Sequence, residues 1–225
     1  MIAERLKEVL DSLPAGVRLV AVSKFHPEEA IMEAYRAGQR LFGESRVQEL
    51  TAKHEDLPHD IEWHFIGHLQ TNKVRQIASY VALIHGVDSY HLLEEISRQG
   101  ERVGREVPCL LQLHIAQEET KFGFSFEECR QMLAAGAWRT LHGVHICGLM
   151  GMASFTDDQG QVSREMQSLA DFFHEVKAKW FADDDAFREL SMGMSDDYPL
   201  AVAAGSTMVR VGSRIFGARD YGNGA

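Results

Sequence analysis

The most strongly apolar stretch of the chain is Val107-Pro-Cys-Leu-Leu-Gln-Leu-His-Ile115. A near-continuous apolar run of this kind predicts a strand of a parallel sheet that is covered by helices. Segments with helical periodicity flank it, at about residues 90–104 before the run and at about residues 126–135 after it. The same alternation of strand and helix continues along the chain in both directions.

Short apolar runs predict seven further strands, at residues 18–23, 40–43, 62–67, 80–85, 142–150, 189–192 and 207–212. Helices are predicted at residues 2–12, 28–37, about 46–55, 70–79, about 161–182 and about 197–204, with a last helical turn at 213–217. Eight strand–helix units in 225 residues predict a single α/β domain, residues 1–225, folded as a (β/α)8 TIM-type barrel with an extra N-terminal helix. An open doubly wound sheet is the alternative, because periodicity does not show closure. The lack of a G-x-G-x-x-G fingerprint after the first strand disfavours that alternative.

The composition narrows the class of protein. The chain is 45% hydrophobic and 25% charged, which is typical of a globular protein, and its formal net charge of −10 argues against nucleic-acid binding. No apolar run reaches about 18 residues, so we expect no membrane span. The three cysteines, Cys109, Cys129 and Cys147, are scattered, which fits a reducing compartment. We therefore expect a cytoplasmic protein.

Chemistry in this fold collects at the carboxyl ends of the strands. Lys24 follows the first strand, where it is either a solvated end residue or an amine kept neutral by lost hydration and able to attack an aldehyde. Glycine and hydroxyl residues follow the seventh and eighth strands, in Ser191-Met-Gly-Met-Ser195 and Gly205-Ser-Thr-Met-Val-Arg-Val-Gly-Ser213. Such residues cap ordinary turns, but these two loops commonly build a phosphate site in this fold. A phosphorylated aldehyde would satisfy both features.

Six stretches, in order and spread over nearly the whole chain, resemble the pyridoxal phosphate homeostasis proteins, whose barrel is related to that of alanine racemase. They are Ala21-Val-Ser-Lys24, Phe42-Gly-Glu-Ser-Arg-Val-Gln-Glu49, Trp63-His-Phe-Ile-Gly-His-Leu-Gln-Thr-Asn-Lys73, Gly148-Leu-Met-Gly-Met152, Leu190-Ser-Met-Gly-Met-Ser-Asp-Asp197 and Gly205-Ser-Thr-Met-Val-Arg-Val-Gly212. The resemblance implies a protein that binds pyridoxal 5′-phosphate (PLP). The PLP-binding residues that it implies are Lys24, Asn72, Met150, Ser195, Arg210, Gly212 and Ser213.

The resemblance also implies a role for each of these positions. Lys24 would form the Schiff base, and Arg210 would face the pyridine nitrogen. The phosphate would be contacted by Ser195, Gly212 and Ser213. Asn72 and Met150 would lie near the cofactor, with core packing as the alternative for the methionine.

Two residues depart from the family, which usually has asparagine where this chain has Ser45 and His114. Both positions are expected near the cofactor, so their polar contacts to the ring substituents are expected to differ from those usual in the family. Glu44, Arg46 and Glu49 are interpreted as a salt-bridged helix start, with a cofactor-facing role for Glu44 as the alternative.

We expect a carrier rather than an enzyme. An arginine only donates hydrogen bonds, so beside the pyridine nitrogen it would leave the ring a weak electron sink. A racemase also needs acid–base groups on both faces of its substrate, and the chain lacks the second β domain of alanine racemase. None of the tyrosines matches a catalytic position of the family: Tyr35, Tyr80, Tyr90, Tyr198 and Tyr221.

The leading hypothesis is thus a monomer that stores PLP and delivers it to apo PLP-dependent enzymes, without robust turnover. One alternative is an amino-acid racemase or decarboxylase that uses the same lysine. A second alternative is a barrel aldolase in which Lys24 attacks a phosphosugar carbonyl. We expect no metal, because His64 and His68 lie across a strand end rather than on one helical face.

Overall fold

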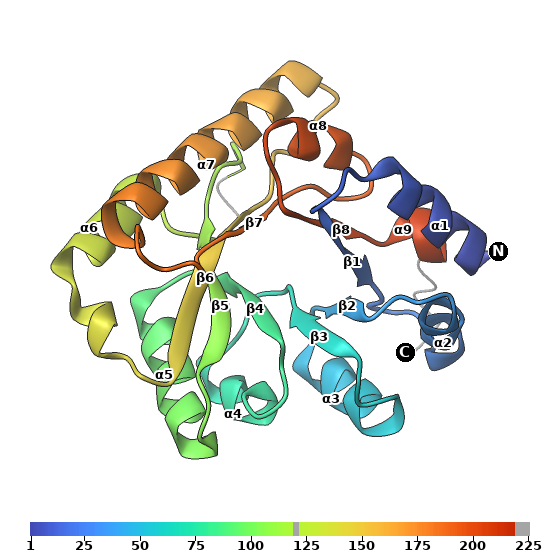
Figure 1. Cartoon of the computed structure of the whole chain (residues 1–225), viewed down its shortest axis with the longest axis horizontal. Coiled ribbons are helices and arrows are strands. Elements are labelled where there is room, and N and C mark those ends of the chain that lie inside the picture. Colours follow the sequence, from blue (N-terminus) through green and yellow to red (C-terminus); the bar gives the residue numbers. More distant parts are fainter. Residues whose placement is uncertain (119–121, 219–225) are drawn as a thin grey trace.

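The structure, a computed structural model, describes residues 1–118 and 122–218. Within them, parallel strands pair in sequence order and β1 closes the barrel against β8 (Figure 1). The strands are β1 (Arg18–Val22), β2 (Leu41–Glu44), β3 (Glu62–Phe65), β4 (Leu83–Val87), β5 (Val107–Leu113), β6 (Val144–Gly151), β7 (Glu189–Ser191) and β8 (Met208–Val211). The predicted (β/α)8 barrel is confirmed, and the open sheet is excluded.

Helices surround the strands on the outside of the barrel (Figure 1). They are α1 (Ile2–Ser12), α2 (Glu28–Arg36), α3 (Val47–Asp56), the 3₁₀ turn η1 (Thr71–Lys73), α4 (Val74–Ile77), α5 (Tyr90–Val103), α6 (Phe126–Ala135), the 3₁₀ turn η2 (Ala137–Thr140), α7 (Gln159–Trp180), α8 (Tyr198–Ala203) and α9 (Ser213–Phe216). Local sequence sets several of their ends. At the start of α6, Ser125 and Glu128 form a reciprocal capping box, and α5 is followed by Gly104 in the left-handed conformation, with a φ of 70°.

Two apolar layers hold the barrel. The larger one lies between the strands and the helices and contains the largest buried side chains, such as Phe42, Trp63 and Phe65. The smaller one fills the inside of the barrel with residues from β1, β4, β5, β6 and β8: Val20, Leu83, Leu110, Met150 and Met208. These side chains fill the barrel interior, which is therefore a packed core rather than a channel. Burial of each such side chain stabilises the fold by roughly 1.5–3 kcal/mol.

The fourth predicted unit is displaced. The apolar run 80–85 predicts the strand, but β4 begins at Leu83 because Tyr80 and Val81 still donate their N–H groups to Ile77 of α4. The helix predicted over 70–79 is divided into η1 and α4. Periodicity alone does not separate the apolar end of a helix from the strand that follows it.

None of the helices in the described part of the chain has the length and apolar character needed to cross a bilayer. All three cysteines are free thiols, with Cys109 and Cys129 fully buried.

Candidate functional site

The turn after β1 presents Lys24 at the carboxyl ends of the strands, which we call the barrel mouth. The N–H of His26 donates to the carbonyl of Ser23 at 3.1 Å and closes a four-residue turn around the half-buried Lys24. The third residue of this turn, Phe25, has a φ of 65°. Turns of this kind normally use glycine or asparagine there, because the left-handed region costs a residue with a bulky side chain about 1–2 kcal/mol. The turn is therefore strained beside the lysine.

Charged side chains from β2 and α3 lie directly behind this turn. Glu44 is fully buried and accepts hydrogen bonds from Ser23 Oγ at 2.6 Å and from Lys53 Nζ at 2.8 Å. Lys53 also donates to Glu49 Oε1 at 2.7 Å, and Glu49 Oε1 accepts the N–H of Phe25 at 2.7 Å. Burial raises the pKa of Glu44 to about 7, against the charge and hydrogen bond of Lys53 and the Ser23 hydrogen bond. The cluster therefore holds the residues on both sides of Lys24.

This arrangement corrects the expectation of a helix start bridged by Arg46. Among the described residues Arg46 forms no ion pair, and its guanidinium lies over the ring of Phe25 at 4.7 Å. The cation that joins the two glutamates is Lys53, which sequence reasoning did not single out. Its spacing of four residues from Glu49 suggests an ordinary surface pair, and only the structure reveals that this lysine is 5% exposed.

The predicted phosphate residues gather at the ends of β7 and β8. Ser195 is buried in the loop after β7, and its Oγ accepts the N–H of Gly212 at 3.2 Å. Gly212 follows β8, where a Cβ would stand 3.1 Å from the carbonyl oxygen of Val22 at the end of β1. Ser213 is exposed and begins α9. A Cβ at Gly212 would make a tighter contact than usual, so glycine favours the close approach of the β8 end to the end of β1.

Arg210 carries a positive charge into the interior from β8. It is 3% exposed, and its guanidinium donates to Ser191 Oγ at 2.6 Å and to the carbonyl of Gly151 at 3.1 Å. Burial lowers its pKa to about 10, while the charge of Asp197 acts in the opposite direction. No carboxylate of the described residues forms an ion pair with this arginine. A buried cation whose direct partners are neutral fits a ligand that brings an electron-rich acceptor, such as a pyridine nitrogen.

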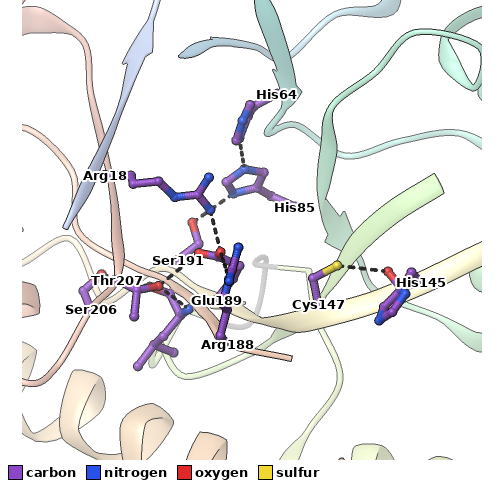
Figure 2. A network of polar contacts seen from close by, with 11 residues as sticks. Arg18, His64, His85, His145, Cys147, Arg188, Glu189, Ser191, Ser206 and Thr207 are labelled. Atoms are coloured by element: carbon purple, nitrogen blue, oxygen red, sulfur yellow. Dashed lines mark hydrogen bonds and ion pairs between the residues drawn. The ribbon is translucent and has the colours of Figure 1, made fainter. Parts of the chain in front are cut away.

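A line of polar side chains continues from Ser191 across the barrel (Figure 2). Ser191 Oγ lies 2.9 Å from His85 Nδ1, and His85 Nε2 lies 2.9 Å from His64 Nδ1. Burial, and then the nearby charge of Arg18, lowers the pKa of His64 to about 3. Burial, followed by His64, Arg210 and Arg18, lowers the pKa of His85 well below its usual range. Both imidazoles are therefore neutral at pH 7, and the line is a structural support for Arg210 rather than a set of charges.

The remaining expected site residues are more scattered. Met150 is 1% exposed inside the barrel, and its β6 position pairs with Ser191 of β7, the serine that holds Arg210. Asn72 is exposed in η1, and no described contact links it to the other expected residues. The structure thus places Ser195, Gly212 and the end of β1 together but not Asn72.

For the two residues that depart from the family pattern, the described contacts involve backbone atoms. The imidazole Nε2 of His114 lies 2.8 Å from the carbonyl oxygen of Glu118, and the N–H of His114 donates to Phe124. The backbone of Ser45 packs against Gly67, where a Cβ would stand 2.5 Å from the Ser45 carbonyl oxygen. In the described residues no cluster of histidine, cysteine or carboxylate groups is arranged to hold a metal ion.

Comparisons with known proteins cover almost the whole chain. Residues 1–220 match the family described as alanine racemase, N-terminal domain. A pyridoxal phosphate homeostasis protein from Synechocystis is 38% identical over 217 residues, which cover 94% of this chain and 96% of that protein. The protein of the same name from Escherichia coli is 37% identical, over 98% of this chain and 97% of its own.

Solved structures agree with these sequence matches. PipY from Synechococcus elongatus, in a structure with PLP bound, is 40% identical and superposes with a TM-score of 0.86 over 96% of this chain and all of its own. An alanine racemase from Clostridium difficile, at 12% identity and a TM-score of 0.72, shares the fold over 95% of this chain and 56% of its own. The chain therefore belongs to the family of pyridoxal phosphate homeostasis proteins and carries the fold of the alanine racemase N-terminal domain.

Proposed function

We propose that this protein binds PLP in the barrel mouth, holds it as a Schiff base on Lys24, and takes part in storing and delivering the cofactor. One observation carries the proposal. The end of β1, two residues before Lys24, packs against Gly212, whose N–H is held by Ser195. The residues assigned to the aldehyde and to the phosphate therefore converge on one edge of the barrel. Family membership and the PLP-bound structure of PipY support the same ligand.

Each residue of the site has a distinct task in this proposal. The amine of Lys24 forms a C=N bond with the aldehyde carbon that PLP supplies, and water is released. Ser195, Gly212 and Ser213 receive the phosphate, and the buried guanidinium of Arg210 meets the pyridine nitrogen. Met150 lines the interior beneath them, and Asn72 is proposed to contact the cofactor from the loop after β3.

Binding without robust turnover is the proposed mode of action. The hydrogen bonds of Arg210 to Ser191 and Gly151 fix a permanent cation where a strong electron sink would need a carboxylate. The relatives are named as homeostasis proteins, which supports a role in handling the cofactor. We place this role in the cytoplasm, supported by the free thiols Cys109, Cys129 and Cys147. A monomer that passes PLP to apo enzymes, and binds no nucleic acid, completes the proposal.

Borohydride reduction tests the covalent assignment. Protein saturated with PLP should give, after reduction and digestion, a phosphopyridoxyl group on the peptide that contains Lys24. Lys24→Ala should yield no such adduct while keeping the wild-type circular dichroism, because an end-of-strand side chain leaves no large core cavity. Lys7→Ala, which removes an exposed lysine of α1, is the matched control and should keep the adduct. An adduct on another lysine, or none in the wild type, contradicts the proposal.

A further inference from the structure

Resting on the proposed function, we propose that Glu49 and Lys53 are positioning residues that lock the Lys24 turn in the conformation from which its amine reaches the cofactor. Neither side chain is among the residues expected to contact PLP. They act on the backbone on either side of Lys24, through the N–H of Phe25 and the carbonyl of Ser23.

Glu49 holds the residue that follows the lysine. Its Oε1 accepts the N–H of Phe25 at 2.7 Å and the Nζ of Lys53 at 2.7 Å. A charged acceptor makes this a stronger hydrogen bond than a neutral one. The N–H that it fixes belongs to the residue whose φ is 65°. The carboxylate therefore stabilises the positive φ of Phe25, a backbone conformation that residues other than glycine rarely adopt.

Lys53 holds the residue that precedes the lysine. Its Nζ donates to the carbonyl of Ser23 at 3.0 Å, as well as to Glu44 and Glu49. Three acceptors use all three hydrogens of the ammonium group, so its orientation is fully determined. The hydroxyl of Ser23 is held in turn by Glu44. Ser23 and Phe25 are therefore both fixed, and with them the backbone on either side of Lys24.

The strained conformation of Phe25 explains why the hydrogen bonds with Glu49 and Lys53 are needed. Without them, Phe25 would relax to negative φ, rotate the adjoining peptide and turn the Lys24 side chain away from its present direction. The guanidinium of Arg46, the residue just before α3, adds a third contact by lying over the Phe25 ring. Small misplacements of a reacting group cost large factors in rate, so a loosened turn should slow attachment of the cofactor.

The experiment compares Glu49→Ala, Phe25→Gly and the double variant with the wild type. Stopped-flow absorbance of apo-protein mixed with PLP gives the rate of Schiff-base formation. Affinity for pyridoxine 5′-phosphate, which has an alcohol in place of the aldehyde, reports binding of the ring and phosphate alone. Glu55→Ala, at an exposed position of the same helix, is the matched control.

Glu49→Ala should slow Schiff-base formation at least about tenfold, with little change in affinity for pyridoxine 5′-phosphate. Phe25→Gly in the Glu49→Ala background should restore most of the lost rate, because glycine adopts positive φ without the hydrogen bond to Glu49. A wild-type rate in Glu49→Ala overturns the inference, as does an equal loss of affinity for both ligands or a failure of Phe25→Gly to rescue. If the wild type forms no Schiff base at Lys24, the proposed function itself fails, so the two failures are distinguishable.

Discussion

Ser195 joins two parts of the proposed phosphate site through a single oxygen. Its Oγ accepts the N–H of Gly212, which leaves the hydroxyl hydrogen to donate to a phosphate oxygen. Ser195→Ala removes that donor, a loss of roughly 1.5–3 kcal/mol for a bond to a charged group. Affinity for PLP should therefore fall by about 10- to 150-fold.

Ser195→Asp should weaken binding much further, because a carboxylate repels the phosphate at close range. Equilibrium dialysis with both variants measures the difference, in the Lys24→Ala background so that covalent attachment does not mask it. Equal affinities of the Ala and Asp variants would mean that Ser195 does not face the phosphate.

Single residues also mark the limit of sequence reasoning. Lys24, Ser195 and Gly212 stand in recognisable stretches, and the structure brings their segments together. Lys53 and His85 were not found, because their importance comes from burial and from partners far away in the chain. His85 joins Ser191 from 106 residues away, and no local pattern encodes such a contact.

At the scale of elements, the neighbouring strands β3 and β4 carry neutral histidines that predict a pH dependence of stability. His64 has a folded pKa of about 3, below the value near 6.5 expected when unfolded. As the pH falls below about 6.5, His64 of the unfolded chain binds a proton, whereas His64 of the folded chain stays neutral. The stability present above that pH is therefore lost on acidification. His64 alone should therefore cost about 2 kcal/mol of stability between pH 7 and pH 5.

Glu44 acts in the opposite direction, because its folded pKa of about 7 makes the folded chain bind the extra proton. Its contribution is fully present below about pH 4.5 and is lost as the pH rises through 7, so wild-type stability alone does not isolate the histidines. We therefore compare urea unfolding of the wild type and His64→Gln at pH 5 and pH 7. The variant should lose about 2 kcal/mol less on acidification. His91→Gln, at an exposed histidine, is the control, and an equal pH response in wild type and His64→Gln would contradict the buried neutral imidazole.

Elements were predicted better than their boundaries. Helix α1 and helix α6 have the expected bounds. Amphipathic periodicity alone marks α1, which has no side-chain cap, whereas a capping box at Ser125 and the left-handed Gly136 delimit α6. Strand β5 ends at Leu113 rather than at residue 115, because the N–H of His114 pairs with Phe124 of the following loop. A contact with a loop is a tertiary effect, which the apolar run 107–115 does not contain.

At the scale of the whole molecule, the closed barrel places one cluster of reactive and polar groups at one end. The relatives named as homeostasis proteins match over 96% and 97% of their own length, whereas the alanine racemase is matched over 56%. Tyr221, one of the tyrosines considered as an opposing base, lies outside the described residues. Among the described residues we therefore test His114 as a second base, because a histidine can accept a proton near neutral pH.

We expect no appreciable racemisation or decarboxylation of common amino acids. His114 is half-buried at the end of β5, and a carbonyl only accepts, so its Nε2 carries the hydrogen that it donates to Glu118. Only Nδ1 is left to serve as a base opposite Lys24. Proton–deuterium exchange at the amino-acid α-carbon in heavy water, followed by NMR with PLP-loaded protein, measures whether any base acts.

Exchange should be no faster than free PLP produces. Arg210, at the pyridine nitrogen as we propose, would leave the ring a weak electron sink, and a single imidazole nitrogen would have to supply the second acid–base group. The comparison includes Lys24→Ala and His114→Asn, the latter restoring the residue usual in the family. Enzyme-like exchange in the wild type that disappears in both variants would establish a two-base racemase and overturn the carrier assignment. Exchange that survives in His114→Asn but not in Lys24→Ala would instead show turnover with the lysine as its base, which contradicts the expected absence of turnover and leaves His114 as a residue that only fastens the loop at Glu118.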